Sequence, residues 1–124
     1  MGDHLSRDIE YLRKAADSGN TEAMFLLAVC LAEGKKAPQD FRQAAKWFHE
    51  ASKKGHVRAG LSLAFLYSKG RGVRLDQKLA YKMMKEAQQK GDPLAGDLVS
   101  MLRQQMSPQM LKEAEKLVAA GVVE

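Results

Sequence analysis

Apolar and polar side chains along this 124-residue chain are mostly spaced as helices require, and one stretch breaks the usual pattern. Ala23 to Ala32 is a run of ten residues without a polar side chain, closed on its two sides by Glu22 and Glu33. A helix on a protein surface normally keeps a charged face. Ten helical residues rise about 15 Å, half of the hydrocarbon core of a bilayer. The run is therefore too short to cross a membrane, and it predicts a helix without the charged face that a surface helix turns to solvent.

Small and apolar residues recur along the chain every 36 positions. Gly19 is followed at this spacing by Gly55 and Gly91, and Ala23 by Ala59 and Ala95. Further matches at the same step are Leu27 with Leu63 and Val99, Gly34 with Gly70, Asp40 with Asp76, and Ala44 with Ala80. Self-similarity at a period of this size indicates an array of identical supersecondary units.

Each unit contains the start and stop signals of two helices. The first helix ends at Gly34 or Gly70, because a glycine readily adopts the left-handed conformation that closes a helix. The second helix begins at Asp40 or Asp76, which are good N-caps. The expected N-caps of the first helices are Asn20, the weaker His56, and Asp92 with Pro93 at the first helical position.

These residues resemble the Sel1-like repeat, a relative of the tetratricopeptide repeat. The first copy reads AMFLLAVCLAEG and then DFRQAAKWFHEASKKG, which matches the family's alanine, leucine, glycine and aromatic positions. The second copy has the family's loop pair, Gly72 and Val73, but methionines in place of Trp47 and Phe48. The resemblance covers residues 19–100. It implies an all-α fold, a right-handed α-solenoid of stacked antiparallel helix pairs with about seven helices.

The flanking segments read as degraded copies, as expected where an end repeat has a neighbour on one side only. We expect a single domain over residues 1–124, with an N-terminal capping helix at 5–18, repeat 1 at 19–54, repeat 2 at 55–90, and a degenerate repeat 3 with a C-terminal capping helix at 91–121. Ser107 and Pro108 predict the start of the last helix. This helix resembles the closing helix of bacterial family members, so we expect a complete chain.

The family register assigns one line of each first helix to the inner, concave surface. The slots of Ala23, Leu27, Ala28 and Leu31 are expected to pack in the core, which leaves the positions i, i+4, i+7 and i+11 from residue 22. The predicted partner-binding residues are Glu22, Leu26, Val29 and Glu33, then Arg58, Ser62, Phe65 and Lys69, then Leu94, Leu98, Met101 and Gln105.

The middle of this predicted surface is apolar except for Ser62, and its rim is charged. The concave face of stacked repeats is usually where ligands lie, and an apolar floor with a polar rim is typical of a protein interface. We interpret the chain as a non-catalytic adaptor that binds a partner protein or peptide there, or a second copy of itself as a homodimer. Two other interpretations stay open: a groove filled by its own side chains, and a register shifted by one residue.

The resemblance and the net charge supply two further functions. Some short bacterial members of the family are cognate inhibitors of secreted toxins, so an immunity protein is the first alternative. The net charge of +5 and the pI near 9.4 suggest a nucleic-acid or anionic-surface binder as the lesser one. Acidic residues interleave with the basic ones, which favours an ordinary solvated surface. The outer basic residues concerned are Lys46, Lys53, Lys54, Lys82, Lys85 and the loop from Arg71 to Arg74.

Catalytic residues, cofactors and metal ions are not expected. His4, His49 and His56 lack metal-ligand spacing, and the two loops are connectors at fixed repeat positions rather than phosphate-binding loops. Cys30 is the single cysteine, which excludes an internal disulfide and predicts a buried structural thiol. The N-terminus has no apolar segment of a secretory signal, so we expect a cytoplasmic protein.

Overall fold

The computed structural model describes residues 2–121, with side chains from Asp8 onward, and this part of the chain is helical. Seven helices are present in it, and the prediction of an all-α solenoid is confirmed. The helices are α1 (Gly2–Asp17), α2 (Thr21–Glu33), α3 (Phe41–Lys53), α4 (Val57–Lys69), α5 (Gln77–Gln89), α6 (Ala95–Gln105) and α7 (Pro108–Gly121).

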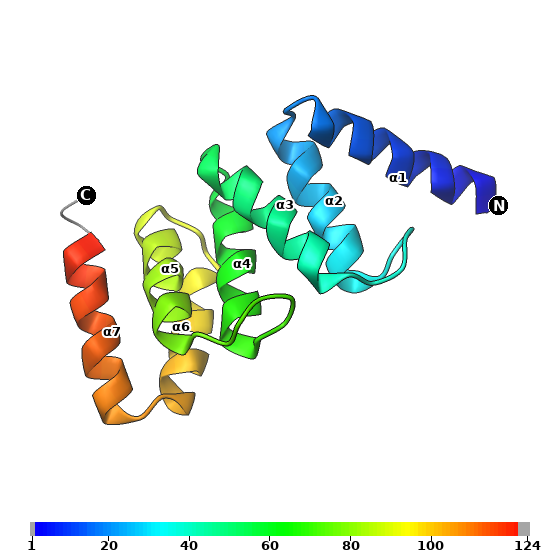
Figure 1. Cartoon of the computed structure of the whole chain (residues 1–124). Helices are drawn as coiled ribbons and strands as arrows, with labels where there is room; N and C mark the ends of the chain where they lie inside the picture. The colour runs from blue at the N-terminus through cyan, green and yellow to red at the C-terminus, as the bar shows by residue number, and fades with distance from the viewer. Residues whose placement is uncertain (1, 122–124) are drawn as a thin grey trace.

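The helices stack in chain order, so the first and last helices lie at opposite ends of the array (Figure 1). Within a repeat, α2 packs against α3 and α4 against α5. Between repeats, α3 packs against α4 and α5 against α6. The helices α2, α3, α4 and α5 thus each bury one side against the partner helix of their repeat and another against a neighbouring helix, while Leu26 of α2 stays 43% exposed.

Most of the predicted helix boundaries are confirmed. Gly34 and Gly70 close α2 and α4 with φ angles of 71° and 65°. Asp40 and Asp76 cap α3 and α5. Each carboxylate accepts a hydrogen bond from the backbone N–H three residues later in the chain, at 3.0 Å in both cases. Asn20 caps α2 and Ser107 caps α7 in the same way.

The expected start of α6 is wrong. Asp92 and Pro93 do not begin this helix, which starts at Ala95 and has no side-chain cap. The Asp92 carboxylate accepts a hydrogen bond from the Leu94 N–H at 2.9 Å, and both of its oxygens also bind Arg58 of the preceding repeat. Because the carboxylate is held by Arg58, it does not accept a hydrogen bond from the backbone N–H three residues later, as the Asn20 side chain does.

The core consists of two adjoining clusters of buried residues. The first joins α1, α2, α3 and α4, and the second joins α4, α5, α6 and α7. The residues expected in the core of α2, Ala23, Leu27, Ala28 and Leu31, are all buried. Cys30 packs against the first cluster but is only half-buried, so the prediction of a buried thiol was wrong in degree.

The last helix departs from the repeat. It packs against α5 and makes at most marginal contact with α6, the helix that would be its partner in a regular repeat. Only Met106 and Ser107 separate α6 from α7, whereas seven residues separate α4 from α5. The shorter connection places α7 beside α5, as Figure 1 shows. No helix among the described residues has the length and hydropathy needed to span a membrane.

Candidate protein-binding groove

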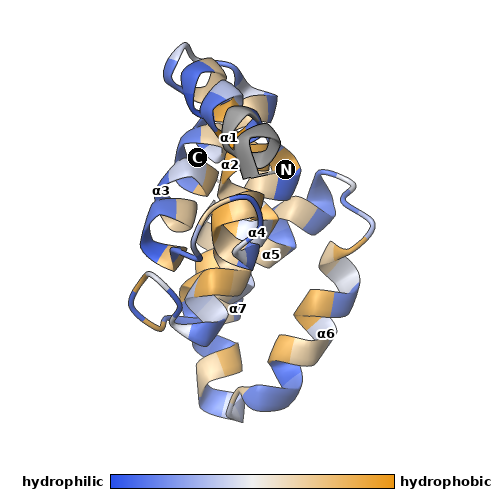
Figure 2. Cartoon of the chain, turned by 90° about the vertical axis from the view of Figure 1, so that its right-hand side faces the viewer, coloured by the Kyte–Doolittle hydropathy of each residue, from blue (hydrophilic) through white to orange (hydrophobic). Residues whose placement is uncertain are grey.

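The inner line predicted on α2, on α4 and on α6 with the preceding Leu94 contains both exposed and half-buried apolar side chains. Leu26, Leu94 and Met101 have exposed fractions of 43%, 48% and 53%, which is high for side chains of this size and hydropathy. Val29, Phe65 and Leu98 are half-buried. A register shifted by one residue would place Leu27, which is fully buried, on this line. Apolar turns are visible on both α4 and α6 in Figure 2.

A groove of about 370 Å³ runs along this line, and we call it the inner groove. Seven of the twelve predicted residues line it: Val29, Glu33, Arg58, Ser62, Phe65, Leu94 and Leu98. A smaller hollow between α4 and α6 shares Phe65 and Leu98 with it and adds Lys69, Met101 and Gln105. The structure thus brings ten of the predicted residues together, while Glu22 and Leu26 line neither space.

The sequence pattern missed the groove residues that do not belong to the first helices. Phe41 and Phe48 of α3 form part of its wall, and Gln39 and Arg71 enter it from the two loops. Phe41 occupies the aromatic slot after the capping aspartate, which was the available signal for it. Arg71 lies in the basic loop, and its guanidinium stands 5.6 Å from the centre of the Phe41 ring.

At the rim, Arg58 is held by an inter-repeat ion pair. Its guanidinium donates to the two Asp92 oxygens at 2.7 Å and 3.0 Å. The Asp92 side chain has an exposed fraction of only 4%. These hydrogen bonds hold the pKa of the Asp92 carboxyl below its ordinary value and raise the pKa of Arg58. The main role of Arg58 in the fold is therefore to join two neighbouring repeats.

Glu22, at the other end of the rim, is also bound to the next repeat. His56 Nε2 lies 2.8 Å from Glu22 Oε1, and His56 Nδ1 accepts the Ala59 N–H at 3.0 Å. A neutral ring that accepts at Nδ1 carries its proton on Nε2, so Nε2 donates to Glu22. The ring also stacks on Phe25 with centroids 4.4 Å apart. His56, expected to be a weak cap, is thus a well-supported one.

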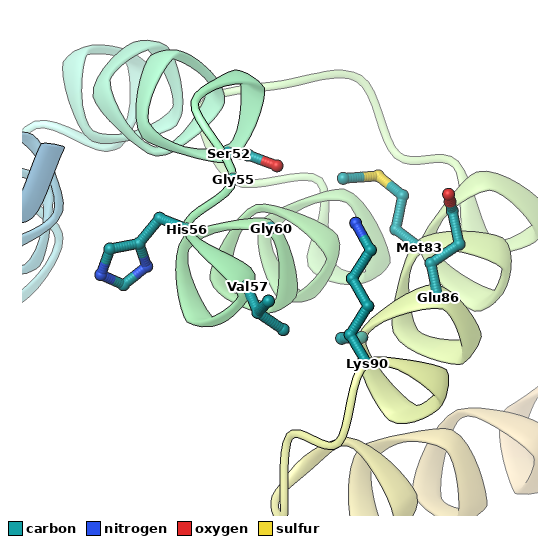
Figure 3. A pocket seen from close by; sticks show the side chains of 9 residues that line it. Ser52, Gly55, His56, Val57, Gly60, Met83, Glu86 and Lys90 are labelled. Carbon is teal, nitrogen blue, oxygen red and sulfur yellow. The ribbon is translucent and has the colours of Figure 1, made fainter.

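Figure 3 shows the other side of this junction. His56 points away from a small pocket whose lining includes Ser52, Met83 and Lys90. The pocket holds only about 70 Å³, well below the roughly 300–1,000 Å³ of ordinary ligand sites. We therefore assign it no ligand.

Two cations, Arg71 in the inner groove and Lys69 in the smaller adjoining hollow, have no ion pair within the described part of the chain. Lys69 Nζ stands 5.8 Å from the centre of the Phe65 ring, and Arg71 stands over Phe41. Glu33 pairs with Lys35 at 3.2 Å, both exposed. Groups of three or more histidine, cysteine, aspartate or glutamate side chains that could hold a metal ion are absent from the described residues.

Comparison with known families agrees with the repeat seen in the sequence and the structure. The family model described as Sel1 repeat matches residues 9–20, 21–56 and 59–92, which is more than half of the chain. The chain belongs to the Sel1 repeat family. No curated protein matches it significantly by sequence.

Several solved structures are similar to this Sel1 repeat protein. The c5321 protein, described as a protective antigen present in uropathogenic Escherichia coli strains, is 30% identical with a TM-score of 0.81, covering 91% of this chain and 24% of its own. The cysteine rich protein B of Helicobacter pylori is 26% identical with a TM-score of 0.66, covering 73% and 68%. A Sel1 repeat protein from Oxalobacter formigenes is 24% identical with a TM-score of 0.70, covering 77% and 40%.

These comparisons establish the fold and the general role of the repeat. The Sel1 repeat is generally a protein–protein interaction module. The chain spans about a quarter of the length of the c5321 protein. What the longer proteins bind therefore does not carry over to this chain as an established property.

Proposed function

We propose that this chain is a non-catalytic adaptor that binds a partner protein through the inner groove. The observation that carries the proposal is an open groove of about 370 Å³ that is lined by apolar side chains from successive repeats, Val29, Phe65, Leu94 and Leu98. Contiguous apolar surface of this kind marks interaction sites on soluble proteins. The groove is open, which argues against filling by its own side chains.

The floor of the groove supplies the binding energy in this proposal. Burying Val29, Phe65, Leu94 and Leu98 of the groove against a partner, with Met101 of the adjoining hollow, contributes about 5–10 kcal/mol before the cost of association. Arg71 in the groove and Lys69 in the adjoining hollow add positive charge, so carboxylates on the partner are favoured there. The expected location is the cytoplasm.

The outer basic residues are poorly arranged for the alternative function, the binding of nucleic acid or another anionic surface. Lys53 pairs with Glu50 at 3.2 Å. Lys82 and Lys85 are half-buried. These residues do not form one continuous exposed row, so we retain protein binding as the proposed function.

The test uses peptides selected from a random display library on the immobilised chain. The Phe65→Glu/Leu94→Glu variant should weaken the binding of the selected peptides at least about a hundredfold, since it removes apolar contacts of the groove and buries charge. The matched control is Tyr11→Glu/Leu117→Glu, which changes two exposed apolar residues outside the groove. Circular dichroism checks that both variants stay helical.

Equal peptide affinities for the two variants would contradict the proposal. Light scattering behind a sizing column supplies the second arm. A monomer is expected for the wild type. A wild-type dimer that Phe65→Glu dissociates would also contradict the proposal, because the groove would then be covered by a second copy of the chain.

A further inference from the structure

A second hollow lies on the outer side of the array, between α3, the end of α4 and the turn at Gly72 and Val73. It encloses about 420 Å³, and we call it the outer crevice. Arg42, Lys46 and His49 line one side of it at helical spacing on α3. Its lining contains no aspartate or glutamate.

The basic side of the outer crevice has no acidic partner among the described residues. Arg42, Lys46 and His49 are all exposed, and none of them takes part in an ion pair among the described residues. Ala45, Leu63 and Tyr67 form an apolar floor beneath them. The crevice is thus apolar at its base and positive along one edge.

The next repeat shows what covers the equivalent surface. Adding the repeat length of 36 to Arg42, Lys46 and His49 gives Lys78, Lys82 and Lys85 of α5. These three side chains are half-buried. The helix that packs on α5 at this place is α7.

Two carboxylates of α7 face the basic and polar side chains of α5 and α6. Glu113 Oε2 lies 3.7 Å from Lys78 Nζ. Glu115 accepts a hydrogen bond from the Tyr81 hydroxyl and lies 4.0 Å from Arg103. At the other end of α7, a Cβ added to Gly121 would lie 2.8 Å from Lys82 Cε.

The apolar residues of α7 complete the contact. Met110, Leu111 and Val118 pack against the core cluster that contains Tyr81. Ala114, the most buried residue of α7, belongs to the same cluster and is fully buried. Within one chain, therefore, an amphipathic helix with two carboxylates covers the basic and apolar outer side of a repeat.

We propose that the outer crevice on α3 binds an amphipathic helix of a partner protein, carrying carboxylates in the arrangement seen on α7. The crevice differs from the covered surface at several positions, among them Tyr67 in place of Arg103, and one further difference decides its preference for a large side chain. Ala45 stands where α5 has the large and fully buried Tyr81. The partner helix therefore carries a large apolar side chain at the place where α7 has Ala114.

This binding surface is separate from the inner groove, because the residues that line the two hollows are different. The proposal thus does not depend on what the inner groove binds. Phe65→Glu in the groove leaves binding at the outer crevice unchanged.

The test uses a labelled peptide with the sequence of residues 107–121 and the change Ala114→Leu. The leucine fills the space above Ala45, whereas above Tyr81 it is disfavoured because overpacking a filled site is costly. Fluorescence anisotropy on the full chain measures its dissociation constant. Saturable binding is expected, and the unchanged peptide should bind several-fold more weakly.

The decisive variant of the chain is Arg42→Glu/Lys46→Glu, which reverses two exposed charges without breaking an ion pair. We expect the peptide to bind it at least about tenfold more weakly. The charge-matched control, Lys90→Glu/Lys116→Glu, changes exposed residues elsewhere and should leave binding within about twofold. Arg42→Ala/Lys46→Ala should give an intermediate loss.

Three results would overturn the proposal. The first is the absence of saturable binding, or equal binding to all variants. The second is a loss of peptide binding that occurs only in a Lys78→Glu/Lys82→Glu variant of the chain, which would mean that the peptide displaces α7 from α5. The third is a wild-type dimer that Arg42→Glu/Lys46→Glu dissociates, because a second copy of the chain would then occupy the crevice.

Discussion

Gly72 and Lys36 occupy equivalent positions in the two loops, but only Gly72 suits the backbone conformation found there. Gly72 has a φ of 74°, and a Cβ at this position would lie 2.3 Å from the Phe41 carbonyl oxygen. Only glycine tolerates that contact. Lys36 occupies the equivalent position of the first loop and has a φ of 68° without being a glycine. A left-handed conformation costs about 1–2 kcal/mol for a residue with a Cβ.

We predict that Lys36→Gly stabilises the chain by about 0.5–1 kcal/mol, because glycine relieves this conformation. The exposed ion pair between Lys36 and Asp8, at 3.6 Å, is lost at little cost. Urea denaturation measures the effect. Lys35→Gly is the control, because Lys35 is exposed and not in the left-handed region. A Lys36→Gly variant less stable than the wild type would contradict the prediction.

The sequence was informative about residues whose role is local. Gly34, Asp40 and Ser107 are helix boundaries that follow from the conformational and hydrogen-bonding preferences of each residue alone. Asp92 was assigned wrongly because its carboxylate is bound by Arg58, 34 residues earlier. That interaction depends on how two repeats are placed in space, which a capping rule does not include.

At the scale of elements, this pair couples α4 to the turn that precedes α6, at the rim of the inner groove. The pKa of the Asp92 carboxyl is lowered by the hydrogen bonds from Arg58. A carboxyl group with a lowered pKa in the folded state stabilises the fold above its unfolded pKa, and this stabilisation is lost as the pH falls through the folded pKa. The pair therefore contributes at neutral pH and fades below about pH 4.

We predict that Arg58→Ala lowers the free energy of unfolding by about 1–2 kcal/mol at pH 7, because it leaves a nearly buried carboxylate without its partner. The difference from the wild type should shrink at about pH 3, where Asp92 becomes protonated in the variant. Urea denaturation at the two pH values measures it. Arg74→Ala, which removes an exposed arginine, should change stability by less than about 0.5 kcal/mol at both. If the free energies of unfolding of Arg58→Ala and the wild type differ as much at pH 3 as at pH 7, this account is refuted.

At the scale of elements, the repeat period predicted the helices but not all of the groove. The inner line of α2, α4 and α6 follows from the register of the family it resembles, carried along the chain by the 36-residue step. Phe41 and Arg71 enter the groove from the start of α3 and from a loop, so no helical period indicates them. The position of α7 follows from the two-residue connection after α6, whose consequence for packing is visible only in three dimensions.

The whole molecule is an array whose repeats each contact only their neighbours, so its two long faces are continuous. The inner face is apolar along its middle, and the outer face has an open crevice on one repeat and a covered one on the next. This geometry suits a scaffold that contacts other proteins on more than one side. The Sel1 family provides the fold, and the side chains on these faces determine what this member binds.

The most direct test of the inner groove is site-specific photo-crosslinking in the cells that make the protein. A benzophenone amino acid replaces Phe65 in the groove or, as the control, Tyr11, which is 72% exposed and lies outside it. We predict a covalent adduct with a different protein from position 65 that is absent from position 11. The same adducts from both positions, or an adduct from position 65 only with a second copy of this chain, would contradict the account.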